Sequence, residues 1–489
     1  MLKTGREHLE GLRDGRVVYI GGERVADVTA HPAFRNAAET VARLYDLKRD
    51  PAQRDVLSFE EGGERYSTYF LLPKTRDDLV RRMRAHKAIA DATYGLFGRS
   101  PDHVPSFVAG LALQPDVFED GSSRPYRENL LAYYRRARAR DTYVTYAVLP
   151  PQGTRDPEFS QRENFRTPAL AVVAEDDAGV RISGIKTLAT GAIFSDEIWL
   201  GNVQPIAKGQ EAQAITCVVP VNAKGLSLWS RRTFEDHVPS EFDAPLSARF
   251  DESDSVVVCE DVHVPWENIF VHNQAALSRE IYIRTPSHCF GNHQSNVRFW
   301  SKLQLLVALA HRAASLNGTL KIAGVQETLG RLAAFEAAIS GMVHGQCMDH
   351  EDLGNGYVSF NRRIMYGALD WCTDNYPLIT GAVRELLGSS PFMMPADVSV
   401  MDNPEARRMF ETYWAAPGQS AIERMKVFKL AWDLLGSEFG GRHMQYEKFY
   451  AGPSFIVRNH SFRECPWEGF GRTLDGLLAS YDRPGVPAR

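Results

Sequence analysis

The order of three compositional zones constrains this 489-residue chain more than any single motif does. From about residue 141 to about residue 272 the chain consists of short β-branched runs punctuated by Gly, Pro and Asp. The zones on either side carry apolar residues at helical spacing instead. Several strands in succession without intervening helices are typical of a small antiparallel barrel or sandwich. We therefore predict an α+β chain in which a β domain separates two helical domains.

The two outer zones predict amphipathic helices. In the first zone, residues 1–140, the segment 79–98 places apolar residues near helical spacing and fills the other face with Arg and Lys. In the last zone, residues 273–489, the apolar residues of the segment 303–310 form a similar stripe. Such stripes are usually core or subunit contacts. They therefore indicate packing and not chemistry.

The middle zone, residues 141–272, contains a hairpin signal. The stretch 175–179, with the sequence EDDAG, separates two alternating runs. Further strands are expected at 214–221, 226–230 and 254–264, which are rich in Val and other β-formers. The zone therefore predicts a β domain built from short strands.

The charge balance excludes several classes of partner. The chain has 56 Lys and Arg against 61 Asp and Glu, which gives a formal charge of −5 and a pI near 6.3. A chain this mildly acidic has no broad positive field, so we expect neither nucleic acid nor a membrane surface as its main partner. The longest apolar stretches are also far too short to span a bilayer.

The usual short motifs of metal and cofactor sites are missing. The six cysteines are widely scattered and form no CxxC pair, so we predict no metal site and no thioredoxin-type site. With a charged amino terminus, these thiols indicate a cytoplasmic protein. No GxGxxG, P-loop lysine, GxSxG or HExxH occurs, which disfavours Rossmann, P-loop, α/β-hydrolase and zincin chemistry.

Two segments could bring polar side chains into a cavity. The turn at 98–103, GRSPDH, follows an expected helix, and it could aim Arg99 and His103 inward. The alternative is a helix cap with a solvated Arg. At the seam between the first two zones, Gln152 and Arg155 could offer donors to a ring system or a phosphate. The alternative there is a plain linker.

Two further groups of residues have equally open interpretations. Thr187 and Thr190 could face a ligand or could be ordinary strand threonines. The segment 292–298, NHQSNVR, could serve a site, but a buried and hydrogen-bonded His293 is the more common situation. The residue types alone do not decide between these alternatives.

Several segments together resemble one enzyme family. They are the opening 3–34, YDL at 45–47, LPKTRDDL at 72–79, the GRSPD turn, PPQ at 150–152 and VPWENIF at 264–270. The chain closely resembles the oxygenase component of 4-hydroxyphenylacetate 3-monooxygenase, a family that includes chlorophenol and nitrophenol monooxygenases and tailoring hydroxylases of natural products. The similarity extends from about residue 2 to about residue 460.

This resemblance implies an acyl-CoA dehydrogenase-like fold: a helical N-terminal domain at 1–140, a β-barrel at 141–272 and a C-terminal four-helix bundle at 273–489, assembled as a homotetramer. It also implies that a separate NAD(P)H flavin reductase supplies reduced FAD (FADH2). In the family, O2 then forms a flavin C4a-hydroperoxide, which hydroxylates the ring ortho to a phenol hydroxyl. The cofactor supplies the oxygen chemistry, and the protein supplies orientation and a dry cavity.

The resemblance assigns substrate contacts to three residues. Arg99 matches an Arg that touches the substrate, while His103 stands where the family has a Tyr and Tyr146 stands where it has a His. The exchange keeps one base and one hydroxyl in the cavity, so we expect His103 to act as the base and Tyr146 as a donor or acceptor. It also changes the hydrogen-bond geometry around the ring, and we expect an aromatic substrate from natural-product metabolism.

The resemblance also implies a flavin site and a lid. The matching positions are Tyr146, Ala147, Val148, Gln152, Arg155, Thr190, Gly452, Pro453, Ser454 and Phe455. The match at Thr190 includes one extra residue before Asp196. The segment 205–213 corresponds to a mobile loop over the substrate, which would exclude water.

Three other functions compete with this one. One is a 4-hydroxybutyryl-CoA dehydratase of the same superfamily, which would need an iron–sulfur cluster. His293 could match the histidine that binds this cluster. No Cys, however, occupies the turn of Arg99 and His103, where the cluster needs cysteine ligands. An acyl-CoA dehydrogenase would need a catalytic carboxylate, and no residue stands out for that role. A non-catalytic helical assembly protein would ignore reduced FAD.

Overall fold

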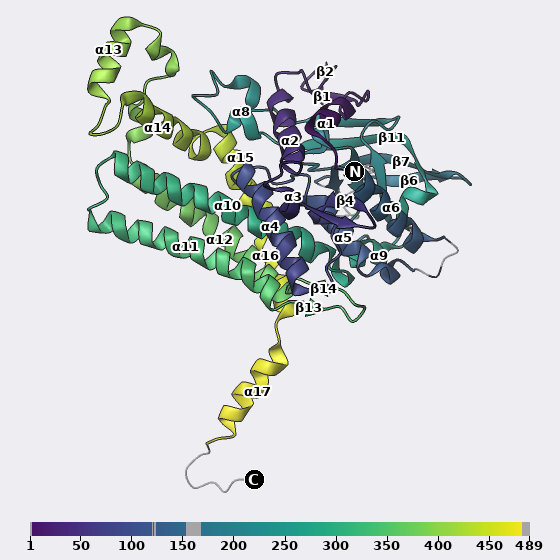
Figure 1. Cartoon of the computed structure of the whole chain (residues 1–489). Helices are drawn as coiled ribbons and strands as arrows, with labels where there is room; N and C mark the ends of the chain where they lie inside the picture. Colours follow the sequence, from purple (N-terminus) through teal and green to yellow (C-terminus); the bar gives the residue numbers. More distant parts are fainter. Residues whose placement is uncertain (1, 120, 122–123, 153–167, 482–489) are drawn as a thin grey trace, which may run out of the picture.

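The computed structural model describes residues 2–119, 121, 124–152 and 168–481. Figure 1 shows two β-sheets with their covering helices on one side and a long helical bundle on the other. The helix nearest the C-terminus points away from both. Within the described ranges, no helix is both long and apolar enough to cross a membrane.

The first zone is mostly helical but also contributes four strands. Its elements are α1 (Gly5–Gly11), β1 (Val18–Ile20), β2 (Glu23–Val25), α2 (Arg35–Leu47), α3 (Arg54–Leu57), β3 (Ser58–Glu61), β4 (Glu64–Ser67), η1 (Thr68–Phe70), α4 (Arg76–Ala92), α5 (His103–Ala112), η2 (Pro115–Phe118) and α6 (Tyr126–Arg140). Strand β1 pairs in parallel with β10 of the middle zone. The predicted boundary at residue 140 is therefore not a boundary of the sheet.

Helix α4 leads directly into the GRSPDH turn. It begins with a capping box, in which Thr75 and Asp78 each bond the other's backbone N–H. It ends at Ala92, and Tyr94 and Gly95 just beyond it have φ of 53° and 67°. A Cβ at position 95 would collide with the backbone of helix α10, so only glycine lets the chain turn this close to that helix.

The middle zone forms two sheets. Its elements are β5 (Val144–Ala147), β6 (Ala171–Glu175), β7 (Gly179–Lys186), η3 (Ala192–Phe194), β8 (Glu197–Leu200), η4 (Glu211–Gln213), β9 (Ile215–Pro220), β10 (Leu226–Ser230), η5 (Glu235–His237), α8 (Ser247–Phe250), β11 (Ser255–Pro265), η6 (Trp266–Asn268) and β12 (Ile269–His272). A six-stranded sheet has the order β2-β1-β10-β11-β7-β6, and a four-stranded sheet has the order β12-β9-β8-β5.

The local strand predictions are confirmed. Strands β6 and β7 pair antiparallel around the predicted turn, with Val172 opposite Ile182. Strands β9, β10 and β11 fall on the three predicted segments. Val180, Ile182 and Val257 are fully buried and pack in one core with residues of the first zone.

The last zone is almost entirely helical. Its elements are α9 (Ala275–Arg284), α10 (Ser287–Leu316), α11 (Ala323–Met348), β13 (Glu351–Asp352), β14 (Val358–Ser359), α12 (Arg362–Leu387), η7 (Ser390–Met393), η8 (Val398–Met401), α13 (Pro404–Tyr413), α14 (Ala421–Leu435), α15 (Glu438–Phe449), α16 (Ser454–Glu464) and α17 (Trp467–Leu478). Helices α10, α11, α12 and α14 lie side by side in the bundle (Figure 1).

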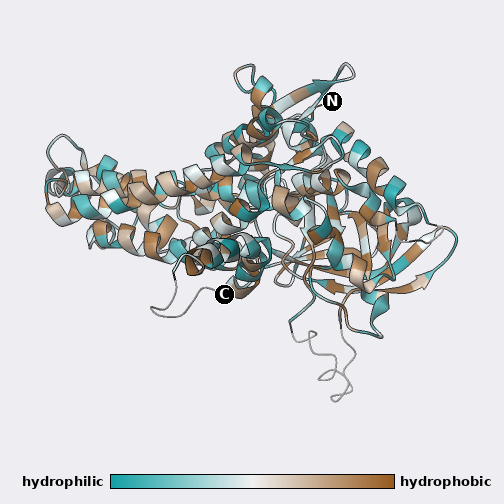
Figure 2. Cartoon of the chain, turned by 90° about the horizontal axis from the view of Figure 1, so that it is seen from below, coloured by the Kyte–Doolittle hydropathy of each residue, from teal (hydrophilic) through white to brown (hydrophobic). Residues whose placement is uncertain are grey.

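Helix α10 connects the bundle to the turn that ends α4. Its C-terminal half carries the predicted stripe, of which Leu303, Leu306 and Ala310 are buried. In Figure 2 hydrophobic and hydrophilic residues alternate along the bundle helices, as expected when one face of each is buried. The N-terminal half of α10 is buried as well, although it is rich in polar residues, and it packs against α4 and α5.

Candidate functional site

The turn before α5 brings Arg99 and His103 into contact. A guanidinium nitrogen of Arg99 lies 2.6 Å from His103 Nε2, and both residues are buried. The Arg99 backbone N–H donates to Glu252 at 2.8 Å, and its carbonyl accepts from the Tyr143 hydroxyl. The alternative interpretation of a solvated Arg is therefore wrong, since the turn holds Arg99 inside the protein.

Aromatic rings surround the guanidinium of Arg99. Its central carbon lies 4.2 Å from the ring centroid of Tyr450, 4.9 Å from that of Tyr146 and 5.9 Å from that of Tyr446. Burial lowers the pKa of Arg99, but these tyrosines and Glu252 more than offset burial and raise the pKa above its usual value. The site therefore contains a fixed positive charge.

His103 is neutral and accepts at Nε2. Burial lowers the pKa of His103 well below its usual value, and the neighbouring Arg99 lowers it further. Because a guanidinium can only donate, the nitrogen that faces Arg99 must carry a lone pair. Nδ1 then carries the proton, and it is buried without a hydrogen-bond partner among the described residues. His103 can therefore take up a proton at Nε2.

Tyr146 completes the group that the sequence predicts. Its ring lies 5.7 Å from the His103 ring, and Phe107 lies 5.3 Å from His103 and 5.5 Å from Tyr146. Burial raises the pKa of Tyr146 to about 12, although Arg99 opposes this effect. Tyr146 is therefore a hydrogen-bond donor at neutral pH. The structure brings Arg99, His103 and Tyr146 together around an apolar wall formed by Phe107.

Polar side chains around Asp102 hold the turn in place. Asp102 accepts from Ser100 at 2.5 Å and contacts His86 Nδ1 at 2.7 Å. Gln294 of α10 reaches the same carboxylate at 3.3 Å. Asp102 makes no side-chain cap bond to α5. The Asp102 carboxylate therefore contacts α4 and α10 and does not cap α5.

His293 is buried and held by contacts within the protein. Its Nδ1 lies 2.7 Å from Gln346 Oε1, and its ring stacks on Phe360 at 3.6 Å. The interpretation of His293 as a buried and hydrogen-bonded histidine is confirmed.

Sequence reasoning did not identify Tyr450 and Ser295. The Tyr450 hydroxyl lies 2.5 Å from His103 Nε2, and it also accepts a hydrogen bond from the Ser295 hydroxyl. Ser295 is in the segment 292–298, and Tyr450 lies two residues before Gly452. The proximity of Tyr450 to the flavin-matched segment was the one available signal.

The described residues matched to the flavin site come mainly from two segments of the chain. Tyr146 and Ala147 end β5, Val148 follows, and Gln152 is exposed. Gly452, Pro453, Ser454 and Phe455 join α15 to α16, where Gly452 has a φ of 93° and Phe455 is exposed. Arg155 lies outside the described residues.

Thr190 forms hydrogen bonds with neighbouring residues of the protein. Its hydroxyl donates to Asp254 at 2.6 Å, and its carbonyl accepts from Thr145 at 2.7 Å. Thr187 forms a bridge to Leu149 beyond the end of β7, as a strand threonine would. Thr190 therefore lies next to β5, but its hydroxyl donates its hydrogen bond to the Asp254 carboxylate.

Strand β5 suits a flat heterocycle. It is the outer strand of the four-stranded sheet among the described strands, so one of its edges is left unpaired by this sheet. Such an edge presents backbone donors and acceptors in one row. A flavin ring carries a matching row of carbonyl and N–H groups on its pyrimidine side. The residues present therefore fit the flavin that the resemblance implies.

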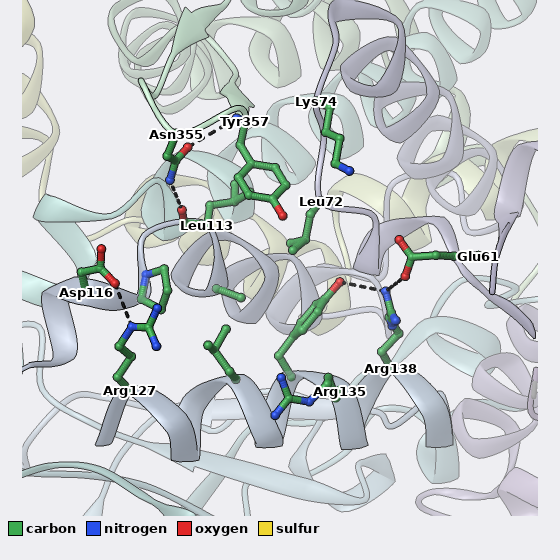
Figure 3. A pocket seen from close by; sticks show the side chains of 14 residues that line it. Glu61, Leu72, Lys74, Leu113, Asp116, Arg127, Arg135, Arg138, Asn355 and Tyr357 are labelled. Carbon is green, nitrogen blue, oxygen red and sulfur yellow. Dashed lines mark hydrogen bonds and ion pairs between the residues drawn. The ribbon is translucent and has the colours of Figure 1, made fainter. Parts of the chain in front are cut away.

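An open cavity elsewhere does not belong to this site. Figure 3 shows a cavity of about 470 Å³ lined by residues of α6, the end of α5 and the segment between β13 and β14. Two of its arginines are paired, Arg127 with Asp116 at 2.8 Å and Arg138 with Glu61 at 2.5 Å. Its lining includes none of the predicted site residues.

Comparisons with known proteins identify the family of this chain. Residues 4–271 match the family model "4-hydroxyphenylacetate 3-hydroxylase N terminal", and residues 278–479 match "4-hydroxyphenylacetate 3-hydroxylase C terminal". The pyoverdin chromophore biosynthetic protein PvcC of Pseudomonas aeruginosa is 34% identical over 99% of this chain and 97% of its own. The oxygenase component of 4-nitrophenol 2-monooxygenase from Rhodococcus sp. is 33% identical over 99% of this chain and 93% of its own.

A solved structure has the same fold. It is the oxygenase component (HpaB) of 4-hydroxyphenylacetate 3-monooxygenase complexed with FAD and 4-hydroxyphenylacetate. It superposes with a TM-score of 0.90 at 29% identity and covers 98% of each chain. The predicted α+β architecture is thereby confirmed.

Proposed function

Because the chain belongs to the 4-hydroxyphenylacetate 3-hydroxylase family, we propose that it is the oxygenase component of a two-component monooxygenase. It hydroxylates a phenolic aromatic ortho to its hydroxyl, with FADH2 from a separate NAD(P)H flavin reductase and O2 as co-substrate. The observation that carries this proposal is the neutral His103 with its Nε2 acceptor, held 2.6 Å from the cation Arg99.

These two residues suit the activation of a phenol. Hydroxylation needs an electron-rich ring, and a phenol becomes more electron-rich when it loses its proton. Nε2 of His103 can accept that proton, and the buried charge of Arg99 stabilises the resulting phenolate in a dry site. Tyr146 orients the ring as a donor, and Phe107 supports it. The exchange of His and Tyr relative to the family pattern favours a substrate other than 4-hydroxyphenylacetate.

The flavin would be held by the β5 edge, by Gln152 and by the segment 452–455. Bound reduced flavin supplies activated oxygen. The chain contributes a water-poor cavity, and the loop at 205–213 would close it. The assignments of Thr190 and Arg155 to this site rest on the resemblance alone.

The experiment that tests the function is His103→Ala, with FADH2 supplied by a generic NADH flavin reductase. We expect hydroxylation of the best phenol in a substrate screen to fall by about 10²- to 10⁴-fold, the usual range for losing a general base. Reduced FAD should still bind with unchanged affinity. His311→Ala, an exposed change in α10, is the control. Full coupled turnover by His103→Ala would remove His103 from the mechanism.

A lyase of the dehydratase type is the second candidate. It shares flavin use, but its cluster needs thiolates where this chain has Arg99 and His103. An O2-dependent gain of one oxygen in the product mass would exclude it. Absence of any response to reduced FAD would exclude both enzymes.

We also propose that the enzyme is a homotetramer in the cytoplasm. Helix α17 supports the assembly, because its apolar side chains Trp467, Phe470, Leu474 and Leu477 are all exposed, although Arg363 of α12 lies 5.5 Å from the Phe470 ring centroid. Figure 1 shows this helix projecting from the rest of the chain. A helix with such a face is stable only when another surface covers it. The six free cysteines support the cytoplasmic location.

A further inference from the structure

Tyr450 occupies the position next to the base of the candidate site. Its hydroxyl lies 2.5 Å from His103 Nε2, and its ring lies 4.2 Å from the guanidinium carbon of Arg99. The Ser295 hydroxyl of α10 donates to the same hydroxyl. The chain thus places a phenol of its own against the two residues that would activate a substrate phenol.

His103 offers a single lone pair to this phenol. Arg99 can only donate, so Nε2 is an acceptor and Tyr450 must donate to it. A substrate phenol that gives its proton to His103 needs the same lone pair. That lone pair already faces the Arg99 guanidinium at 2.6 Å and the Tyr450 hydroxyl at 2.5 Å, so a substrate phenol can reach Nε2 only when the Tyr450 hydroxyl leaves it.

The backbone around Tyr450 permits a local movement. One turn earlier, Glu447 is bound to Arg298 and Lys302 of α10, which anchors α15. After Tyr450, α15 has ended, and Gly452 with a φ of 93° precedes Pro453. Glycine is the residue with the widest range of backbone conformations, so the junction between α15 and α16 is where the chain can most easily change direction. The mobile unit would be the short link that carries Tyr450.

We propose that Tyr450 is a specificity-determining gate that competes with the substrate's phenol for His103. The inference rests on the proposed function, since it assumes that a phenol binds at His103. When the substrate binds, the Tyr450 hydroxyl leaves Nε2, and the link to Gly452 moves with it. Because 452–455 also matches the flavin site, phenol binding is coupled to the flavin segment.

The test compares phenols with their deoxy analogues on full-length wild type and Tyr450→Phe, without flavin. The probes are 4-nitrophenol against nitrobenzene and 4-hydroxyphenylacetate against phenylacetate, with dissociation constants measured by calorimetry. Tyr450→Phe keeps the ring over Arg99 and removes only the hydroxyl. We expect the phenols to bind about three- to ten-fold more tightly, the value of one net hydrogen bond, and the deoxy analogues to be unchanged.

A second variant and a control make the result specific. Ser295→Ala removes the other partner of the Tyr450 hydroxyl, so it should tighten phenol binding in the same direction. Tyr413→Phe changes a tyrosine that is 74% exposed and should have no effect. Hydrogen exchange of 450–453 in the wild type should rise when a phenol binds.

Several results would overturn the gate. They are unchanged or weaker phenol binding in Tyr450→Phe, equal tightening for the deoxy analogues, and failure of both proteins to bind either phenol. None of these requires turnover, so the hydroxylation assay with reduced FAD still decides the proposed function separately. If the wild type hydroxylates the phenol but Tyr450→Phe binds phenols no more tightly, the gate would be refuted and the proposed function would stand.

Discussion

The buried charges between α10 and α15 allow a quantitative prediction for Glu447→Gln. The Glu447 carboxylate accepts two bonds from Arg298 at 2.7 Å and one from Lys302 at 2.5 Å. All three side chains are at most 3% exposed. Burial raises the pKa of Glu447, but Arg298 and Lys302 outweigh burial and lower it from 4.5 to about 2.

Two routes give a similar magnitude for this change. Removing one partner of a buried ion pair costs about 3 to 5 kcal/mol, because the other charge is left without compensation. A pKa lowered from 4.5 to about 2 corresponds to about 3 kcal/mol, at about 1.4 kcal/mol per pKa unit. We therefore expect Glu447→Gln to lower the free energy of unfolding by about 3 kcal/mol.

The assay is urea unfolding at neutral pH, followed by tryptophan fluorescence. Glu438→Gln is the matched control, because Glu438 begins the same helix but its pair with Arg232 is about 60% exposed on both sides. We expect that control to lose less than about 1 kcal/mol. Equal and small losses in the two variants would refute the view that Glu447 anchors α15.

The same pair predicts a pH dependence. The pKa of Glu447 is lowered in the folded chain, so its stabilisation is complete above pH 4.5 and is lost as the pH falls toward 2. The stability difference between wild type and Glu447→Gln should therefore shrink between pH 4.5 and pH 2. A difference that stays constant over this range would contradict the assignment.

Two further variants test the packing of the site and of the C-terminal helix. Gly98→Ala would place a Cβ against the Tyr446 ring, so it should lower the free energy of unfolding in urea by about 1 to 3 kcal/mol. Gly330→Ala, in open space on α11, should leave this free energy unchanged or raise it. Similar values for both would contradict the close contact. Leu474→Asp on α17 should lower the molar mass measured by light scattering, because it places a charge on the apolar face. Thr473→Asp, the control, should lower the mass less. An unchanged mass for Leu474→Asp would argue against a role of α17 in assembly.

Local patterns in the sequence predicted much of this fold. The hairpin of β6 and β7 follows from alternation around a turn, and α10 follows from its stripe, because both signals involve neighbouring residues. The resemblance predicted that Arg99, His103 and Tyr146 would share a cavity, and the structure places them together. The strand β1 was missed, since its partner β10 lies about 200 residues away in the chain.

The rest of the site depends on contacts between distant segments. Tyr450 reaches His103 across 347 residues, and Glu447 reaches Arg298 across 149. Neither pairing has a spacing that a pattern can detect, because each exists only once α15 packs beside α10. The polar half of α10 illustrates this: the segment 292–298 gave no clear signal alone, yet Ser295 and Gln294 both contact the site.

The position of His103 supports the proposal that this histidine acts as the base. It is the first residue of α5, where the helix dipole disfavours a positive imidazolium, and Arg99 disfavours it too. Both effects keep Nε2 available as an acceptor. In the proposed function, the same positive end of the helix and the same guanidinium would favour a phenolate beside His103. The features that weaken the base would then also stabilise the product of its proton transfer. A histidine at 146 would lie in strand β5, without the helix terminus, and would depend on Arg99 alone.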